Sequence, residues 1–147
     1  MILDAQNLFS DAQAVTASAA STNLIDLRAT NQDPGVGENL YVVSLVDVAF
    51  TDAGNDSTVT VTLETDTADT FGSATTVQTI GTFAALSAAG TVLIARLQPG
   101  ITERYLRAYY TLANGNLTTG SITTFLCHNV DKYRAYPKSS GSSIDLT

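Results

Sequence analysis

Side chains capable of acid–base, nucleophilic or metal chemistry are few in this sequence. The only histidine, His128, directly follows the only cysteine, Cys127. Adjacent side chains of a strand point to opposite faces, so these two are unsuited to act as a nucleophile and its base. One histidine and one cysteine also fall short of the three or four ligands of a typical zinc site. We therefore expect a protein without enzymatic activity or a cofactor, in which Cys127 is a small core residue.

Carboxylates gather in two short stretches, TDAGND with Asp52 and Asp56, and ETDTAD with Glu64, Asp66 and Asp69. Oxygen-rich loops of this kind can bind calcium. Neither stretch has the twelve-residue EF-hand pattern, and Asp in a turn usually accepts hydrogen bonds from its own backbone. Calcium binding is therefore a minor alternative, and glycosidase chemistry is a weaker one because paired carboxylates at loop tips are common in acidic proteins.

The segment ERYLRAYYTL carries the most distinctive polar and aromatic side chains. Alternation along a strand places Tyr105, Arg107 and Tyr109 on one face. Interfaces are enriched in aromatic rings and Arg, so this face is predicted to bind a protein or to stack on a sugar. The alternative interpretation is a strand buried on both faces, with the tyrosine hydroxyls reaching water.

The elements that must position these residues are predicted to be strands. Val59, Val61 and Leu63 alternate with polar residues, which is typical of a strand with one buried face. Residues 40–50 are nearly all apolar, which indicates a strand covered on both faces near the middle of a sheet. Turn-forming residues lie between these two runs, so residues 39–66 are predicted to form a long antiparallel hairpin.

Further strands are predicted over 23–29, 74–81, 91–97, 104–112 and 120–129, with a loop over 30–38. Turns are expected at Gly90, Pro99-Gly100 and residues 114–116, and only residues 83–89 could be helical. Seven or eight strands at this spacing predict an all-β fold of two packed antiparallel sheets or a barrel, and a jelly-roll β-sandwich suits the length best.

The chain of 147 residues is expected to be a single domain, with an N-terminal arm over 1–22, the sandwich over 23–129 and a C-terminal extension over 130–147. Neither arm can form a core alone, so both are predicted to extend and to contact partner chains. Their spaced anchors are Ile2, Leu3, Leu8 and Phe9 in the first arm, and Tyr133, Arg134, Tyr136, Ile144 and Leu146 in the second.

Composition narrows the class of partner. The net charge is −7 and only seven residues are Lys or Arg, which argues against binding to nucleic acid or to an acidic membrane surface.

The first 22 residues contain Asp4 and Asp11 and no basic residue, unlike a signal peptide. No apolar run is long enough to span a membrane. A single cysteine allows no intrachain disulfide.

Four segments together resemble one protein family: MILDAQNLFSDAQAVTASAAST, GENLYVVS, VTVTLETD and ERYLRAYYTLANG. They are similar to the small capsid cement, or decoration, proteins of short-tailed bacteriophages, which are jelly-roll proteins on an HK97-like shell. The resemblance covers residues 1–129 in order and does not extend into the tail from residue 130. The opening segment is the most specific part, because no folding rule demands it.

This resemblance implies a protein made in the host cytoplasm and bound to the outer surface of the capsid in the virion. Its implied partners are the major capsid protein and a second copy of itself in a homodimer, with a trimer as the alternative. A different class of function stays open, namely a carbohydrate-binding β-sandwich, lectin-like or receptor-binding, that uses Tyr105, Tyr109 and the acidic loops.

Overall fold

The computed structural model describes residues 5–28, 38–128 and 130. Apart from one 3₁₀ turn, η1 (Ala5–Asn7), every regular element in these residues is a strand. The strands are β1 (Leu8–Ala14), β2 (Ala19–Ala20), β3 (Ile25–Asp26), β4 (Tyr41–Thr51), β5 (Thr58–Asp66), β6 (Thr75–Phe83), β7 (Val92–Arg96), β8 (Tyr105–Ala113) and β9 (Thr119–Cys127). The predicted all-β class is confirmed.

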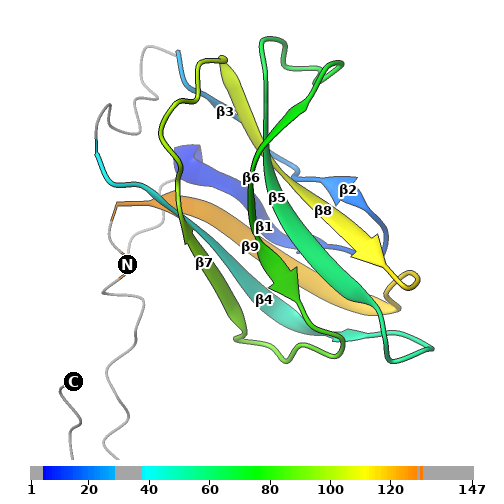
Figure 1. Ribbon diagram of the computed structural model, residues 1–147. Coiled ribbons are helices and arrows are strands. Elements are labelled where there is room, and N and C mark those ends of the chain that lie inside the picture. The colour runs from blue at the N-terminus through cyan, green and yellow to red at the C-terminus, as the bar shows by residue number, and fades with distance from the viewer. Residues whose placement is uncertain (1–4, 29–37, 129, 131–147) are drawn as a thin grey trace, which may run out of the picture.

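The strands form two antiparallel sheets that pack face to face (Figure 1). One sheet has the order β1-β9-β4-β7, and the other has the order β2-β8-β5-β6 with β3 also paired to β8. The chain changes sheet between β1 and β2, β3 and β4, β4 and β5, and at each step from β6 to β9. This strand order is that of a jelly roll, as the sequence predicted.

The predicted hairpin over residues 39–66 is wrong, because its two arms lie in different sheets. Strand β4 pairs with β7 and β9, whereas β5 pairs with β6 and β8. The turn predicted between them is nevertheless present. One carboxylate oxygen of Asp52 accepts hydrogen bonds from the backbone N–H groups of Gly54, Asp56 and Ser57. The loop therefore arches from one sheet to the other.

Burial along the two strands follows the sequence pattern. In β5, Val59, Val61 and Leu63 are fully buried and the residues between them are partly exposed. In β4, residues 42–44 are buried on both faces of the sheet, while Val48 near the other end is exposed. The central position predicted for β4 is confirmed by its two neighbours, β7 and β9.

The core lies between the sheets and is built from large apolar side chains of both. Phe50 of β4 and Phe83 of β6 meet edge to face, with ring centroids 5.7 Å apart. At Gly120, a Cβ atom would come within 2.7 Å of the Phe50 ring. Only glycine therefore lets β9 pass this close to the aromatic pair.

The N-terminal arm predicted over 1–22 is wrong for the residues that the structure describes there. Strand β1 pairs with β9, β2 pairs with β8, and Phe9 and Val15 are fully buried in the core. Phe9 therefore cannot contact another chain, whereas Leu8 is half-buried in the sandwich and its contact with a partner stays a prediction. Two register shifts in β1, with Ala12 at φ +44°, interrupt the alternation that would have identified this strand from the sequence.

The helix considered for residues 83–89 is also wrong. Strand β6 continues to Phe83, and the chain then makes turns closed by hydrogen bonds from the Ser87 N–H to the Ala84 carbonyl and from the Thr91 N–H to the Ala88 carbonyl. Leu86 has φ +57°, a left-handed backbone conformation that ends a right-handed helix. The other predicted strands are present with shifted ends, and 23–29 shortens to β3.

Several sequence predictions concern residues outside those that the structure describes. They are most of the loop over 30–38 and the candidate contacts Ile2, Leu3, Tyr133, Arg134, Tyr136, Ile144 and Leu146. Within the described ranges, no helix has the length and hydrophobicity to cross a membrane.

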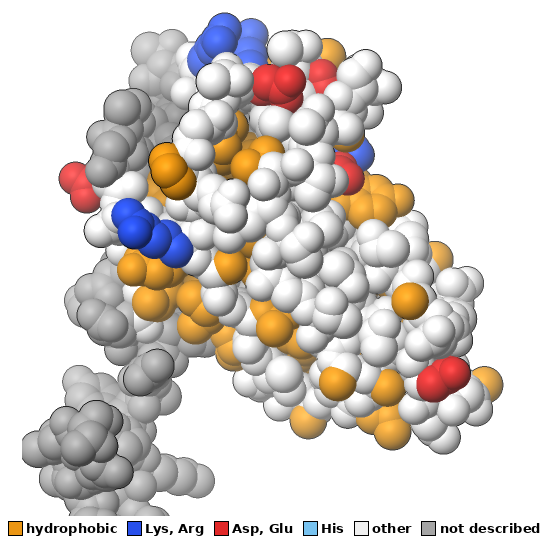
Figure 2. All heavy atoms as spheres, in the orientation of Figure 1, with side chains coloured by type: hydrophobic (Ala, Val, Ile, Leu, Met, Phe, Trp, Pro, Cys, Tyr) orange, Lys and Arg blue, Asp and Glu red, His pale blue; other side chains and the backbone are white. Residues whose placement is uncertain are grey.

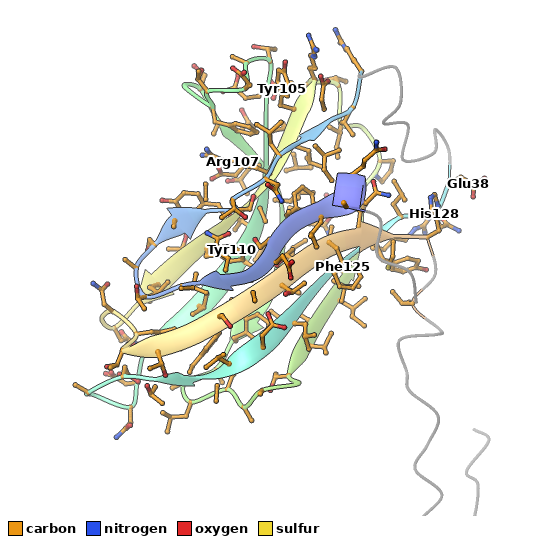
Figure 3. The ribbon with its side chains drawn as sticks, turned by 180° about the vertical axis from the view of Figure 1, so that it is seen from behind. Glu38, Tyr105, Arg107, Tyr110, Phe125 and His128 are labelled. Carbon is orange, nitrogen blue, oxygen red and sulfur yellow. The ribbon has the colours of Figure 1, made fainter. Side chains whose placement is uncertain are left out.

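A buried polar network joins the two sheets. Tyr110 of β8 is fully buried, and its hydroxyl lies 2.5 Å from Ser10 Oγ of β1 and donates to Thr124 Oγ1 of β9 at 2.8 Å. Thr124 Oγ1 is in turn 3.0 Å from Ser44 Oγ of β4. Figure 3 shows Tyr110 between β8 and the opposite sheet. Burial raises the pKa of Tyr110, opposed by its two hydroxyl partners.

We predict that Val61→Asp prevents folding, whereas Thr60→Asp leaves the melting temperature nearly unchanged. Val61 points into the core, where an unpaired carboxylate has no compensating partner, and Thr60 lies on the outward side of the same strand. Circular dichroism melts of both variants check this. Equal loss of stability in the two variants would contradict the strand register.

We also predict that Tyr110→Phe lowers the free energy of unfolding by about 1–2 kcal/mol, because buried hydrogen bonds across the sheets are lost. For a chain of this size the melting temperature should fall by roughly 3–6 °C. Tyr109→Phe, on the outward side of β8, is the matched control and should melt like the wild type. An unchanged melting temperature for Tyr110→Phe would show that the network adds no net stability.

Candidate interaction surface

The outward side of β8 presents the three residues that the sequence singled out. Leu106, Ala108 and Tyr110 are buried toward the core, while Tyr105, Arg107 and Tyr109 alternate with them and are partly exposed. Their predicted placement on one face is therefore confirmed. We call the surface formed by Tyr105, Arg107 and Tyr109 the Arg107 surface, and Figure 3 labels two of its residues, Tyr105 and Arg107.

Arg107 is held in one geometry by three neighbours. It is directly opposite Glu64 of β5 in the sheet, and its Nε and Nη2 atoms each lie 2.8 Å from Glu64 Oε2. The guanidinium carbon lies 4.2 Å from the ring centroid of Phe71 and 5.6 Å from that of Tyr109. A planar guanidinium can pair with a carboxylate and stack on rings at once, which an ammonium group cannot do.

The loop after β5 holds Phe71 in place through the second acidic stretch. Asp66 is buried, and its two carboxylate oxygens accept hydrogen bonds from the backbone N–H groups of Ala68, at 3.0 Å, and Ser73, at 2.8 Å. These donors lower the pKa of Asp66. Phe71, at φ +51°, is buried against the Arg107 side chain. The carboxylates of ETDTAD thus include one that pairs with Arg107 and one that closes the loop.

A second arginine extends the surface past the beginning of β8. Arg104 forms an ion pair with Asp26 of β3 at 2.7 Å, and its guanidinium carbon lies 4.9 Å from the ring centroid of Tyr105. The hydrogen bond from Arg104 lowers the pKa of Asp26 and raises that of Arg104. Two tyrosine rings therefore each lie beside a guanidinium that a carboxylate fixes.

Beyond these charges, the outward side of the sheet is lined by threonines. Thr60 and Thr82 face each other across β5 and β6 with their hydroxyl oxygens 2.9 Å apart, and Thr62 donates to the Tyr109 carbonyl. Register places Thr76 and Thr79 on the same side. In Figure 2, uncharged polar groups and backbone cover most of the visible face, with few charged side chains. Such a surface can meet another chain without removing many charges from water.

The remaining residues that the sequence offered for chemistry are Asp52, Cys127 and His128. Asp52 closes its own loop, as expected for Asp in a turn, and this also lowers its pKa despite partial burial. Cys127 is half-buried at the end of β9 and lies outside the core cluster, so its assignment as a core residue is wrong. His128 is exposed. Within residues 5–28 and 38–128, no three His, Cys, Asp or Glu side chains gather to hold a metal ion.

The outward side of the other sheet was missed as a candidate surface. It presents Tyr41, Val43 and Leu45 of β4, Val92 and Ile94 of β7, and Phe125 of β9, and we call these six residues the apolar face. The sequence indicates this side as well, because residues 40–46 other than Ser44 are apolar at odd and even positions alike. That pattern predicts a strand covered on both sides, and in the structure the core between the sheets lies on the side of Val42 and Val46.

Fold and surface together define a jelly-roll protein with Arg and Tyr side chains held by ion pairs and ring contacts on the outward side of one sheet. The Bbp16 family model matches residues 9–126, and the chain therefore belongs to the Bbp16 family. The family's name suggests a bacteriophage protein. No curated protein matches the chain.

We predict that Asp66→Asn destabilises the protein at pH 7 and that its deficit relative to the wild type shrinks in acid. The folded-state pKa of Asp66 is lowered, so its contribution to stability is present above the usual Asp pKa of about 3.9 and is lost as the pH falls through the lower folded value. Melting temperatures between pH 7 and 3 measure this, with the exposed Asp69→Asn in the same loop as the control. A deficit of the same size at every pH would contradict the role of the ionised carboxylate.

Proposed function

We propose that this protein is a capsid cement protein that binds the outside of a bacteriophage head and stabilises contacts between subunits of the major capsid protein. Membership of the Bbp16 family and the sequence resemblance to cement proteins support a role in the phage particle. The observation that carries the proposal is the Arg107 surface, in which Tyr105, Arg107 and Tyr109 are fixed before any partner binds.

A fixed surface suits a protein that must add stability rather than move. Ordering a flexible Arg or Tyr on binding costs roughly 0.5–1.5 kcal/mol per side chain, and Arg107 is already restrained by Glu64 and Phe71. Arg, Tyr and Phe are also the residues that interfaces enrich. The Arg107 surface can therefore contribute contacts at a low cost in conformational entropy.

The size of the sheet also suits one specific interface. Strands β5, β6 and β8 each have nine residues, so with the short edge strand they form a face of roughly 500 Å², from about 3.3 Å per residue and 4.8 Å per strand. A specific interface takes about 800 Å² from each partner. The sheet supplies most of this, and the loop with Phe71 adds to it. Self-association as a homodimer, or as a homotrimer, would multiply the contacts.

In this proposal the protein is made in the host cytoplasm and joins the virion from outside, with the major capsid protein and its own copies as partners. The acidic net charge fits a position on the outer surface, away from the packaged genome. No part of this role requires a catalytic group or a cofactor.

Co-sedimentation with capsids that lack the protein tests the proposal. We predict that Tyr105→Ala/Tyr109→Ala weakens binding by about 30-fold, the effect of losing a hot spot worth about 2 kcal/mol. Arg107→Lys should weaken binding less, because the charge stays and the stacking is lost. Leu86→Ser, on the turn after β6, is the control and should bind like the wild type.

Wild-type occupancy by a folded Tyr105→Ala/Tyr109→Ala variant would contradict the use of this surface. A glycan array, run with and without calcium, tests the alternative function of carbohydrate binding, which two tyrosine rings beside guanidinium groups suggest. Saturable sugar binding that disappears in the double variant would replace the cement proposal with a carbohydrate-binding one.

A further inference from the structure

The two open sides of the sandwich lie between edge strands that belong to different sheets. Within the described residues, β1 and β7 are the edges of one sheet, and β2 and β6 are the edges of the other. Side-chain hydrogen bonds connect β1 to β2 at one open side and β6 to β7 at the other. An edge strand presents unpaired N–H and C=O groups, to which a strand of another chain can add. These four edges therefore decide whether the protein can accept a partner strand.

One glutamine side chain closes the open side between β6 and β7. Gln78 Nε2 of β6 donates to the Arg96 carbonyl of β7 at 2.8 Å, and Gln78 Oε1 accepts from the Gln98 N–H at 3.0 Å. Leu97, between these two residues, donates its N–H to the Leu40 carbonyl on the β4 side. The Arg96 carbonyl and the Gln98 N–H therefore face away from β4, toward the place of an added strand. The Gln78 amide takes the place of a peptide group of that strand.

Gln13 of β1 makes the same arrangement at the other open side. Its Nε2 donates to the Ala20 carbonyl of β2 at 2.8 Å, and its Oε1 accepts from the Thr22 N–H at 2.9 Å. The residue between them, Ser21, donates its N–H to the Ala108 carbonyl of β8. Both glutamines thus bind a carbonyl and the N–H two residues later on an outer edge. We call these contacts the Gln13 bridge and the Gln78 bridge.

The bridges act on edge strands that are already short. Strand β2 has two residues and β7 has five. The alternation of hydrogen-bonding directions in β7 points the backbone groups of Val92, Ile94 and Arg96 away from β4, and the Gln78 bridge occupies the Arg96 carbonyl. Within the described residues, this leaves a free edge at Val92 and Ile94 only. Such an edge is shorter than an ordinary strand, which has three to ten residues.

The other two edge strands are irregular. Strands β1 and β6 each have two register shifts against the strand with which they pair. In β6 these shifts lie on either side of Gln78, which is opposite Leu63. Bulges bend and twist an edge, so that a straight strand cannot pair along it. All four edges of the described sandwich are therefore short or irregular, and the bridges occupy backbone groups on the two short ones.

We propose that Gln13 and Gln78 close the open sides of the sandwich to incoming strands, so that partner chains meet the outward sides of the sheets and not their edges. This inference does not rest on the proposed function, because it concerns the free protein. The strand excluded at β7 is β7 of a second copy, which would present the same free backbone groups across a two-fold axis.

Gln78→Ala tests the proposal, with Thr79→Ala on the same strand as the matched control. In amide hydrogen exchange measured by NMR, the Gln98 N–H should exchange about tenfold faster in Gln78→Ala and at the wild-type rate in the control. Sedimentation velocity should show species larger than those of the wild type, growing with concentration, for Gln78→Ala alone. An unchanged exchange rate of the Gln98 N–H, or unchanged sedimentation at every concentration, would overturn the proposal.

A second substitution separates edge pairing from a general loss of stability. Ile94 lies in the middle of β7 and is 43% exposed, and a lysine at an edge opposes the addition of a strand. Gln78→Ala/Ile94→Lys should therefore sediment like the wild type and keep the fast exchange of the Gln98 N–H. Large species that persist in this double variant would show association by another route and would overturn the proposal.

Gln78→Met controls for the size of the side chain, because it keeps the length of glutamine and removes both hydrogen bonds. It should associate and exchange as Gln78→Ala does, and circular dichroism verifies that both variants are folded. Wild-type sedimentation by a folded Gln78→Met variant with fast exchange of the Gln98 N–H would contradict the role of the amide in blocking the edge.

Discussion

The structure depends on a hydrogen-bonded group at the centre of the sandwich, the Tyr110 hydroxyl. It links β8 to Ser10 of β1 and Thr124 of β9, and through Thr124 to Ser44 of β4. Buried polar groups are costly unless paired, so these four side chains fit together in only one alignment of the two sheets. The network thereby sets the relative position of the sheets, which apolar contacts alone specify less strictly.

That alignment gives the molecule two unlike outer sides. The sheet of β5, β6 and β8 carries threonines and the ion-paired Arg107 surface, whereas the sheet of β4, β7 and β9 carries the apolar face. A jelly roll needs only its inner sides for folding, so each outer side is free to serve an interaction. The polar side is fixed by its own contacts, whereas the apolar side is buried at Val43 and Phe125 and exposed at Ile94.

The candidate site was predictable in part. Alternation in β8 sufficed to place Tyr105, Arg107 and Tyr109 together, because strand periodicity alone determines which residues share a side. The partners of Arg107 were not predictable. Glu64 meets it through the register of β5 on β8, and Phe71 reaches it because Asp66 closes a loop. Both contacts join residues more than 30 positions apart in the sequence.

The sequence by itself determined the strands from β3 to β9, most of their buried sides, the all-β class and the turn at Asp52. Only the tertiary structure decided that β4 and β5 belong to different sheets and that β1 is an edge strand with Phe9 in the core. The physical reason is that a pattern of apolar residues indicates which side of a strand is buried. The pattern does not indicate which other strand or segment buries that side. The neighbour of a strand is chosen by the register and packing of the whole sandwich, as it is for β4, whose apolar run lies between β9 and β7 rather than beside β5.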